Sequence, residues 1–415
     1  MKKLIFYLLS AVVILIIVFI VVRSPLARSY NKKGIGFYKI ENFTRAEKFF
    51  KRAVTLKGNY TDALVNLTKT EIALHKFTVA RSTVENLLAK DPENAEGYAL
   101  LGQVEVNGKD YKKSLDHFNQ AISLDSLLAY AYYYRGIAKA NLNDLEGAAD
   151  DYLKAQQLDT SDTKALQRGA VVLGKLEKYD AAVENYSKLI ELDPSNKEAL
   201  LNRGKFKMKI SDFKGSVDDF SRLLAIMPEN LEARYYRGRS LAIMRQYDSA
   251  ISDFKKAVSS GFKVSSGNYN IGLAFMGQNQ PDKAIKYLER CIKTDSSGAN
   301  TASAYHSLGV VSLMKANYAK AVQFFDKCLQ QDSLYVDALF NRAIAYSYLK
   351  DYKSALRDLN TCVAKGRKTA DVYYARGLQK INLNEFHDGC NDLHTAENMG
   401  YNQAADMIKM YCDQQ

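Results

Sequence analysis

Hydrophobic residues return along this chain with a period of about 34 residues that starts near Ala27. Each period holds two bursts in which apolar residues stand three or four positions apart, and a short polar turn such as NLND (141–144) separates the bursts. This spacing places the apolar residues on one face of an α-helix. The pattern therefore predicts an all-α chain built from pairs of short helices.

Particular residue types hold fixed positions within the period, which we number from Ala27. Position 8 is mostly glycine, position 20 is alanine or serine, position 24 is mostly phenylalanine or tyrosine, and position 27 is small or apolar. Small residues let the two helices of a pair approach closely, and the aromatic side chain fills the remaining space. Proline follows several second helices, as at Pro92, Pro194 and Pro228, where no further helical turn is needed.

This order of small residue, alanine, aromatic residue, small residue and proline resembles the tetratricopeptide repeat family. It recurs in eleven units over nearly all of residues 27–403, although tryptophan is absent. The resemblance implies a right-handed superhelical solenoid of helix-turn-helix repeats, whose concave side is lined by the first helix of each unit. It also implies binding of peptides or helices of partner proteins, and seldom catalysis.

We expect units 1–7 over residues 27–264, unit 8 over residues 265–298 and units 9–11 over residues 302–403. The segment QAADMIKMYC (403–412) is amphipathic. We predict that residues 403–415 form a capping helix and tail, because the last repeat of such an array otherwise exposes an apolar face.

Ahead of the repeats lies an apolar segment, residues 4–22, in which only Ser10 is polar. As a helix it would span roughly 28 Å, close to the ~30 Å hydrocarbon core of a bilayer. We therefore predict a short N-terminal tail (1–3), a transmembrane helix that acts as a signal anchor (4–22) and a basic juxtamembrane linker (23–29).

The flanking charges bear on the orientation of this segment. Lys2 and Lys3 favour a cytoplasmic N-terminus, whereas the basic residues after the segment favour the opposite orientation. A short tail before an apolar helix is typical of a signal anchor, so we expect a single-pass membrane protein with a cytoplasmic N-terminus and an extracytoplasmic (periplasmic) body. The alternative is a secreted periplasmic protein with a cleaved signal peptide, although no A-x-A pattern follows the segment.

Arginine at position 7 predicts a structural ion pair within a unit. Five units have this arginine, and the same five have aspartate at position 23, in the second helix. The predicted pairs are Arg135–Asp151, Arg203–Asp219, Arg237–Asp253, Arg342–Asp358 and Arg376–Asp392. Unit 5 departs from this pattern, because Arg168 and Gly169 stand one position early and Asn185 occupies the partner position.

The resemblance assigns positions 5, 6, 9, 12 and 13 to the concave groove. Tyrosine and arginine commonly anchor protein interfaces, and the residues predicted to bind a partner are Tyr133, Tyr134, Asn202, Lys205, Tyr235, Tyr236, Arg239, Tyr269, Asn270, Phe340, Asn341 and Tyr374. The alternative is that these tyrosines pack between neighbouring first helices. The family's recognition of a C-terminal carboxylate is not implied at Asn202, because Glu232 and Tyr236 stand where cations are needed.

The five cysteines fall into two groups. Cys291, Cys328 and Cys362 share position 27 and are predicted to be buried thiols. Cys390 and Cys412 could form a disulfide that joins the cap to the last unit. His387, Cys390 and His394 share a helical face, but such spacing arises easily, and we predict no metal site.

Charge and chemistry limit the remaining functions. Half of the net charge of +12 comes from residues 1–33, so the repeats lack the dense basic face that nucleic-acid binding needs. We find no catalytic constellation and no phosphate-binding loop, and expect no enzyme, no cofactor and no small-molecule substrate. The sequence favours a membrane-anchored scaffold or adaptor of a bacterial cell envelope that binds protein or peptide partners. The alternative is a structural envelope protein that self-associates.

Overall fold

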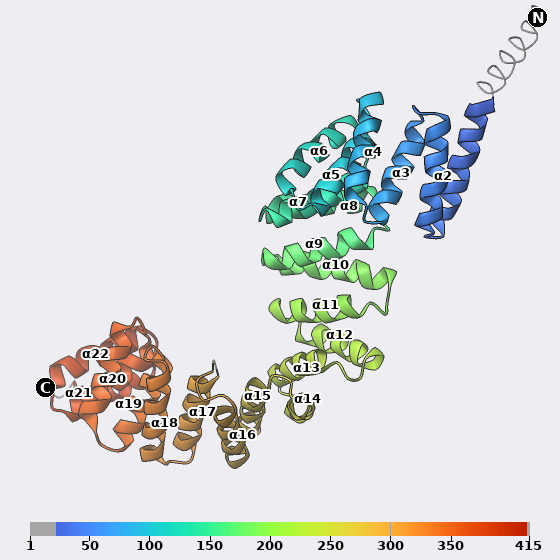
Figure 1. Cartoon of the computed structure of the whole chain (residues 1–415). Coiled ribbons are helices and arrows are strands. Elements are labelled where there is room, and N and C mark those ends of the chain that lie inside the picture. The colour runs from blue at the N-terminus through green and yellow to red at the C-terminus, as the bar shows by residue number, and fades with distance from the viewer. Residues whose placement is uncertain (1–21, 299, 413–415) are drawn as a thin grey trace, which may run out of the picture. The chain divides into compact units, whose positions relative to one another are not determined.

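The regular elements of the described residues are all helices. The computed structural model describes residues 22–298 and 300–412 (Figure 1). The chain divides into two compact units, Met1–Phe206 and Lys207–Gln415, which we call the N-terminal body and the C-terminal body. The prediction of an all-α chain of paired helices is confirmed for these residues.

The N-terminal body begins with a helix over residues 22–39. The helices that follow are α2 (Phe43–Leu56), α3 (Thr61–Ala73), α4 (Phe77–Lys90), α5 (Ala95–Asn107), α6 (Tyr111–Leu124), α7 (Ala129–Asn141), α8 (Leu145–Leu158), α9 (Thr163–Lys175), α10 (Tyr179–Leu192) and α11 (Lys197–Lys209). The division between the bodies falls within α11.

The C-terminal body continues with the same kind of helix. Its helices are α12 (Phe213–Ile226), α13 (Leu231–Ile243), α14 (Tyr247–Ser259), α15 (Val264–Gly277), α16 (Pro281–Thr294), α17 (Thr301–Met314), α18 (Tyr318–Gln331), α19 (Val336–Tyr348), α20 (Tyr352–Ala364), α21 (Ala370–Asn382), α22 (Phe386–Asn398) and α23 (Gln403–Tyr411). These bounds are consistent with eleven two-helix units and a capping helix, a division that stays a prediction.

Neighbouring helices pack in chain order within each body. Both α7 and α9 pack against α8, and α13 and α15 both pack against α14. First helices of adjacent repeats also meet, as α5 meets α7 and α13 meets α15. Each body is therefore a stack in which one side is formed by first helices and the other by second helices.

The turn inside each pair is built around one residue with a positive φ at position 15, such as Lys109, Asn143 or Asn279. This left-handed residue lets the next backbone N–H bond the carbonyl five residues back, as Asp144 bonds Lys139 at 2.9 Å. The Asp144 side chain then caps α8 by accepting from the Gly147 N–H. Local chemistry thus ends one helix and starts the next at the same place in the period.

The core of a pair depends on the glycine at position 8. A Cβ on Gly136 would lie 2.9 Å from the ring of Tyr152, and a Cβ on Gly238 would lie 2.9 Å from the ring of Phe254. Both rings are buried. Glycine therefore permits the close contact between the first helix and the aromatic residue of the second.

The predicted transmembrane helix is corrected. Residues 4–21 of that segment lie outside the described residues. Among the helices that are described, none is long and apolar enough to cross a membrane. Helices α2–α23 have 9 to 14 residues, so the longest spans roughly 21 Å against the ~30 Å of a hydrocarbon core, and their apolar sides pack against neighbouring helices. The prediction of a fold that begins with a transmembrane helix is wrong on this finding.

Two predictions that depended on this segment are corrected with it. The single-pass membrane location, with a periplasmic body, rested on the same apolar run and is not supported by the described helices. The predicted linker over residues 23–29 is helical and continues without a break to residue 39.

Candidate functional site

Arginines at position 7 lie between helices in the interior of each body. Arg135 donates from Nε and Nη2 to both carboxylate oxygens of Asp151, at 2.8 and 2.7 Å. Arg237 contacts Asp253 in the same way, at 2.7 and 2.8 Å. The structure also brings together Arg342 with Asp358 and Arg376 with Asp392. The aspartates are buried, so each pair is a two-bond contact shielded from water.

Each of these arginines also contacts the preceding repeat, which sequence reasoning missed. Nη1 donates to a side chain 16 residues earlier, as from Arg135 to Asn119 at 2.8 Å and from Arg237 to Ser221 at 3.2 Å. Arg203 makes this contact with Ser187 at 3.0 Å, and Asp219 pairs with Lys207 at 3.0 Å. One polar residue stands 16 positions before each arginine and another stands 16 positions after it. This spacing is the signal that could have revealed that the arginine joins three helices.

Most of the residues predicted to bind a partner make contacts between repeats. In three repeats the residue at position 6 bonds the residue at position 5 of the preceding repeat, 35 residues earlier. Such pairs are Arg168 Nε to the Tyr133 hydroxyl (2.9 Å), Asn270 Nδ2 to the Tyr235 hydroxyl (3.0 Å) and Asn341 Nδ2 with His306 Nε2 (2.9 Å). These bonds connect adjacent first helices and occupy part of the predicted groove.

Tyr235 is the clearest correction among these residues. Only 5% of it is exposed, because it packs edge-on against Phe254 and Phe262. It therefore belongs to the core and presents no surface to a partner. Tyr133 occupies the same repeat position but is only partly buried.

The other predicted residues contact neighbouring side chains, and all are half-buried except Arg239, which is exposed. Their contacts are Tyr134 with Gln103 and Phe118, Tyr236 with Phe220, Arg239 with the Tyr236 ring, Tyr269 with the Leu288–Cys291 cluster, Phe340 with Arg367, and Tyr374 with Tyr401. Asn202 and Lys205 lie half-buried on α11.

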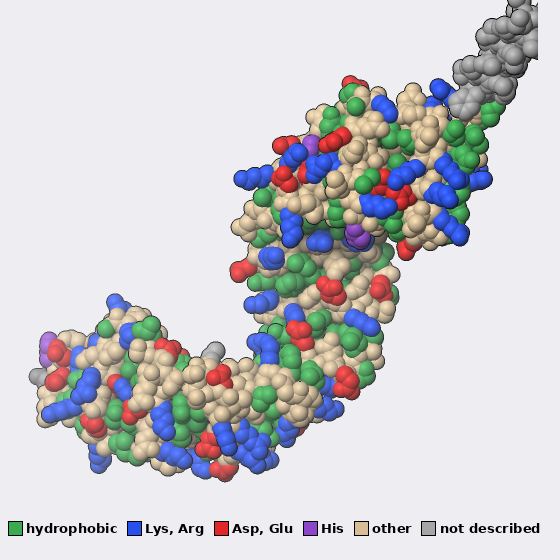
Figure 2. All heavy atoms as spheres, in the orientation of Figure 1, with side chains coloured by type: hydrophobic (Ala, Val, Ile, Leu, Met, Phe, Trp, Pro, Cys, Tyr) green, Lys and Arg blue, Asp and Glu red, His purple; other side chains and the backbone are tan. Residues whose placement is uncertain are grey.

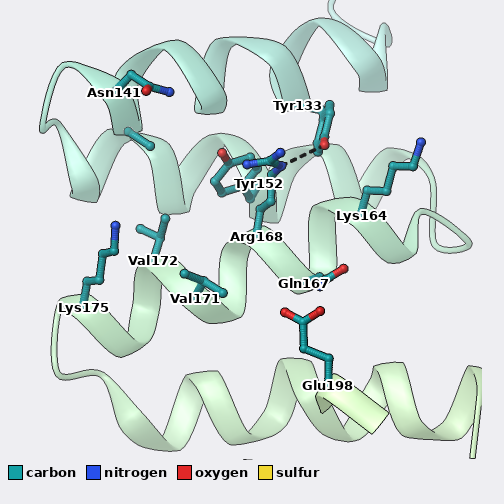
Figure 3. Close-up of a pocket in the computed structure, with 11 residues that line it drawn as sticks. Tyr133, Asn141, Tyr152, Lys164, Gln167, Arg168, Val171, Val172, Lys175 and Glu198 are labelled. Atoms are coloured by element: carbon teal, nitrogen blue, oxygen red, sulfur yellow. Dashed lines mark hydrogen bonds between the residues drawn. The ribbon is translucent and has the colours of Figure 1, made fainter. Parts of the chain in front are cut away.

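One open cavity lies against α9, and we call it the α9 pocket (Figure 3). Its volume is about 650 Å³. Its lining residues are Tyr133, Ala140, Asn141, Tyr152, Lys164, Gln167, Arg168, Val171, Val172, Lys175 and Glu198. Of these, sequence reasoning selected only Tyr133.

The displaced arginine explains why a guanidinium group lines this pocket. A shift of one residue turns a side chain by roughly 100° around a helix. Arg168 therefore points to the open side of α9 and not toward Asn185, which occupies the usual aspartate position. Lys164, Arg168, Val171 and Lys175 follow one another at helical spacing, so they share this face. The irregular unit was the signal that could have identified the site.

The pocket has a cationic rim and an apolar floor. Figure 3 shows Lys164 and Lys175 at opposite ends of the pocket, with Arg168 and the two valines between them. Tyr152 and Val172 are buried, whereas Val171 is 38% exposed. Within the described part of the chain, no acidic side chain forms an ion pair with Lys164, Arg168 or Lys175. The only acid in the lining is Glu198, from α11.

Two pKa shifts follow from this environment. Burial would lower the pKa of Arg168, but the hydrogen bond to Tyr133 and the electrostatic interactions with Tyr133, Tyr152 and Tyr134 together outweigh that effect and raise the pKa. Burial raises the pKa of Tyr152, so its hydroxyl stays protonated. The pocket therefore presents permanent positive charge beside neutral hydroxyl groups.

Family models agree with the helical period. A tetratricopeptide repeat model matches residues 69–129 and 269–335, and a TPR repeat model matches residues 172–211. These three segments therefore have the sequence pattern of tetratricopeptide repeats. No curated protein matches the sequence.

Several solved tetratricopeptide and other structures are similar to this chain at low identity. The APC/C hetero-tetramer Cut9-Hcn1 is 16% identical, with 94% of this chain and 99% of that chain covered and a TM-score of 0.44. The structure of pilF from Pseudomonas aeruginosa is 18% identical, with 52% and 99% covered and a TM-score of 0.46. YrrB, described as a TPR protein with an unusual peptide-binding site, is 20% identical, with 47% and 98% covered and a TM-score of 0.38. These values add no argument about the site.

A second cavity occupies equivalent positions of the 34-residue period in the C-terminal body, and we call it the α15 pocket. Its volume is about 290 Å³, and its lining residues are Arg239, Ala242, Ile243, Tyr247, Phe254, Asn270, Leu273 and Ala274. Six of these residues stand exactly three periods after Ala140, Asn141, Tyr152, Arg168, Val171 and Val172. The same repeat positions therefore form both pockets.

The cysteines offer no further site. Cys390 and Cys412 form a disulfide that joins α22 to the end of α23. Cys291, Cys328 and Cys362 are buried, and burial raises the pKa of Cys328 to about 12 and that of Cys362 to about 11, so these thiols are protonated at neutral pH. In the described ranges, no group of three or more histidine, cysteine or acidic residues is placed to hold a metal ion.

Proposed function

We propose that this chain is a non-enzymatic scaffold that binds a segment of a partner protein on the first-helix side of its repeats. Tetratricopeptide repeats generally serve as protein-interaction scaffolds, and the described residues contain a cavity suited to that role. The observation that carries the proposal is the α9 pocket, which combines exposed charged groups with an apolar floor.

The size and lining of this pocket support binding of side chains from another protein. A cavity of 650 Å³ falls within the range of ligand-binding clefts, roughly 300–1,000 Å³. Its aromatic and arginine residues are of the types that anchor protein interfaces. Val171 supplies exposed apolar surface at the centre, where a partner side chain would be removed from water.

A capture experiment with the full chain tests this proposal. Val171→Asp places a charge on the floor of the pocket, and we expect it to remove the partners that the unchanged chain captures from cell extract. Leu153→Asp is the matched control, because Leu153 is also exposed but lies on α8 outside the α9 pocket. Loss of the same partners with both variants, or with neither, would contradict the proposal.

A second measurement separates this function from self-association. Sedimentation velocity over a range of concentrations should show one species for the unchanged chain and for Val171→Asp. If the unchanged chain associates with rising concentration and Val171→Asp does not, the pocket binds a second copy and the scaffold proposal fails.

A further inference from the structure

The α9 pocket also indicates the chemistry of its occupant, an inference that rests on the proposed function. We infer that it binds an extended segment in which one apolar side chain stands between two acidic ones. The sequence pattern is acid, any residue, apolar residue, any residue, acid. The order of charged and apolar residues along α9, and the spacing between them, determine this pattern.

The charged residues define the two ends of the site. Lys164 and Lys175 are eleven residues apart, which is about 16 Å along a helix. Both side chains are exposed, and Figure 3 shows them at opposite ends of the pocket. In an extended segment, residues four apart lie about 13 Å apart and point to the same side. The long lysine side chains make up the remaining distance, so acids at the first and fifth residues can reach both ends.

The apolar floor defines the centre. Val171 lies between the two lysines in sequence, and its exposed side chain adjoins the buried Val172 and Tyr152. The third residue of the segment points to the same side as the first and fifth. An apolar side chain there would cover Val171, while Arg168 stays beside it with its Nε bonded to Tyr133.

Charge complementarity selects an acidic partner. Three cations and one acid line the pocket, and among the described residues the three cations have no ion-pair partner. Glu198 balances only part of this charge. A cationic or neutral segment would leave the excess unmatched, whereas two acids offset it.

The α15 pocket provides an internal comparison. The residues three periods after Lys164, Arg168 and Lys175 are Ser266, Asn270 and Gly277, none of which is charged. One cation, Arg239, lines the α15 pocket, against three in the α9 pocket. Both pockets have an aromatic residue at the same repeat position, Tyr152 or Phe254. They differ at the repeat positions that hold Lys164, Arg168 and Lys175 in the α9 pocket. The α9 pocket should therefore be the one that recognises acids.

Blocked peptides bound to the full chain test the inference by fluorescence anisotropy. The probe is GESLSEG, amidated at its C-terminus and joined at its N-terminus by an amide bond to an uncharged fluorescent dye, so that it has no terminal charge. We expect binding that weakens with salt, and an affinity about tenfold lower for GQSLSQG and for the variant Lys164→Gln with Lys175→Gln. The control variant, Lys154→Gln with Lys188→Gln, removes the same charge from the second helices α8 and α10 and should bind the probe unchanged.

Three results would overturn the inference. Equal binding of the acidic and glutamine peptides would show that charge is not recognised. Equal loss in the two lysine variants would show a general charge effect. If GESLSEG with a free C-terminus binds and the amidated probe does not, the pocket recognises a terminal carboxylate. If Val171→Asp removes cellular partners while the probe does not bind, the proposed function stands and the acidic occupant is wrong.

Discussion

The α9 pocket and the α15 pocket occupy the same repeat positions in two different bodies, yet they present different chemistry. Both have an aromatic floor, Tyr152 in one and Phe254 in the other, under a first helix. The α9 pocket is about 650 Å³ and cationic, whereas the α15 pocket is about 290 Å³ and mostly apolar. The repeat therefore sets the position of each pocket, and a few exposed residues determine what each pocket can bind.

A related difference concerns the direction of one arginine. Arg135 and Arg237 stand at position 7 and bond a buried aspartate, while Arg168 stands at position 6 and lines a pocket. A structural residue in one repeat thus becomes a surface residue in another through a shift of one position. Charge alone does not distinguish these two roles.

Surface charge is mixed on the face of the described residues that Figure 2 shows. Figure 2 shows lysine and arginine side chains interspersed with aspartate and glutamate on the visible face of the described residues. Interspersed charges of both signs keep a surface soluble and produce little net field. The α9 pocket differs because its cations are gathered around an apolar centre.

The largest expected effect comes from removing the shared floor. Tyr152→Ala and Phe254→Ala each delete a buried ring, and we expect each to lower the free energy of unfolding by about 3–5 kcal/mol. Urea unfolding followed by circular dichroism measures this loss. Tyr152→Phe is the control and should be nearly neutral, since Phe254 shows that the position accepts phenylalanine. A small effect of either alanine change would mean that the floors are not equivalent.

The next largest effect on stability is expected at the ion pair between Arg237 and Asp253. Arg237→Ala and Asp253→Ala each leave a buried charge without its main partner, and each should cost about 3 kcal/mol. The double variant should lose less than the sum, with a coupling energy of about 1–3 kcal/mol. Arg168→Ala should cost clearly less than Arg237→Ala, because Arg168 bonds no carboxylate. Additive effects at residues 237 and 253 would refute the structural ion pair.

Two glutamates at one repeat position offer a pH test of the same principle. Burial raises the pKa of Glu71, which the nearby Thr83 offsets only in part, and neither of its oxygens forms a well-made hydrogen bond in the described structure. Burial would also raise the pKa of Glu105, but hydrogen bonds from Arg81 and Lys113 outweigh that and lower it. Glu71 thus favours its neutral form in the folded chain, and Glu105 its charged form.

The two glutamates should therefore act in opposite directions. Glu71 contributes to stability below its ordinary pKa of 4.5, and this contribution is lost as the pH rises through its raised pKa. Glu105 contributes to stability above pH 4.5, and this contribution is lost as the pH falls through its lowered pKa. At pH 7 we expect Glu71→Gln to raise the free energy of unfolding by about 1–3 kcal/mol and Glu105→Gln to lower it. Urea unfolding at pH 4 and pH 7 measures both, and a shift of the same sign for the two variants would contradict this account.

The smallest expected effect is a gain in peptide affinity when positive charge is introduced into the α15 pocket. Ser266→Lys with Asn270→Arg places cations of the α9 pocket at the equivalent positions of the α15 pocket, and should raise affinity for the acidic probe about threefold above that of the Lys164→Gln, Lys175→Gln background. Gly277 is left unchanged, because a Cβ there would lie 2.5 Å from the ring of Tyr247. Anisotropy with the same probe measures the gain. No gain would show that pocket shape, and not charge alone, distinguishes the two sites.

Much of the fold follows from the sequence, because each of its signals is local. The 3.6-residue spacing of apolar positions predicts the helices, and glycine at position 8 with an aromatic residue at position 24 predicts how the two helices of a pair approach. The prediction of a transmembrane helix failed as a description of this fold, since no described helix is both long enough and apolar enough to cross a membrane.

The candidate site could not be predicted to the same extent. Tyr133 and Tyr235 are the same residue at the same repeat position, and nothing within one unit separates them. Their surroundings differ. The ring centre of Phe262 lies 5.9 Å from the ring centre of Tyr235, whereas the smaller Thr160 occupies the equivalent position after Tyr133. The burial of a groove residue therefore depends on a neighbour that the repeat pattern leaves free to vary.

The sequence by itself determined the helical period, the paired helices and the register in which arginine and aspartate face each other, because these follow from spacing along one chain. The tertiary structure alone decided which equivalent positions are open. Burial depends on how several helices pack together. In this packing Arg168 and two lysines surround the exposed Val171, whereas Tyr235 lies in the core.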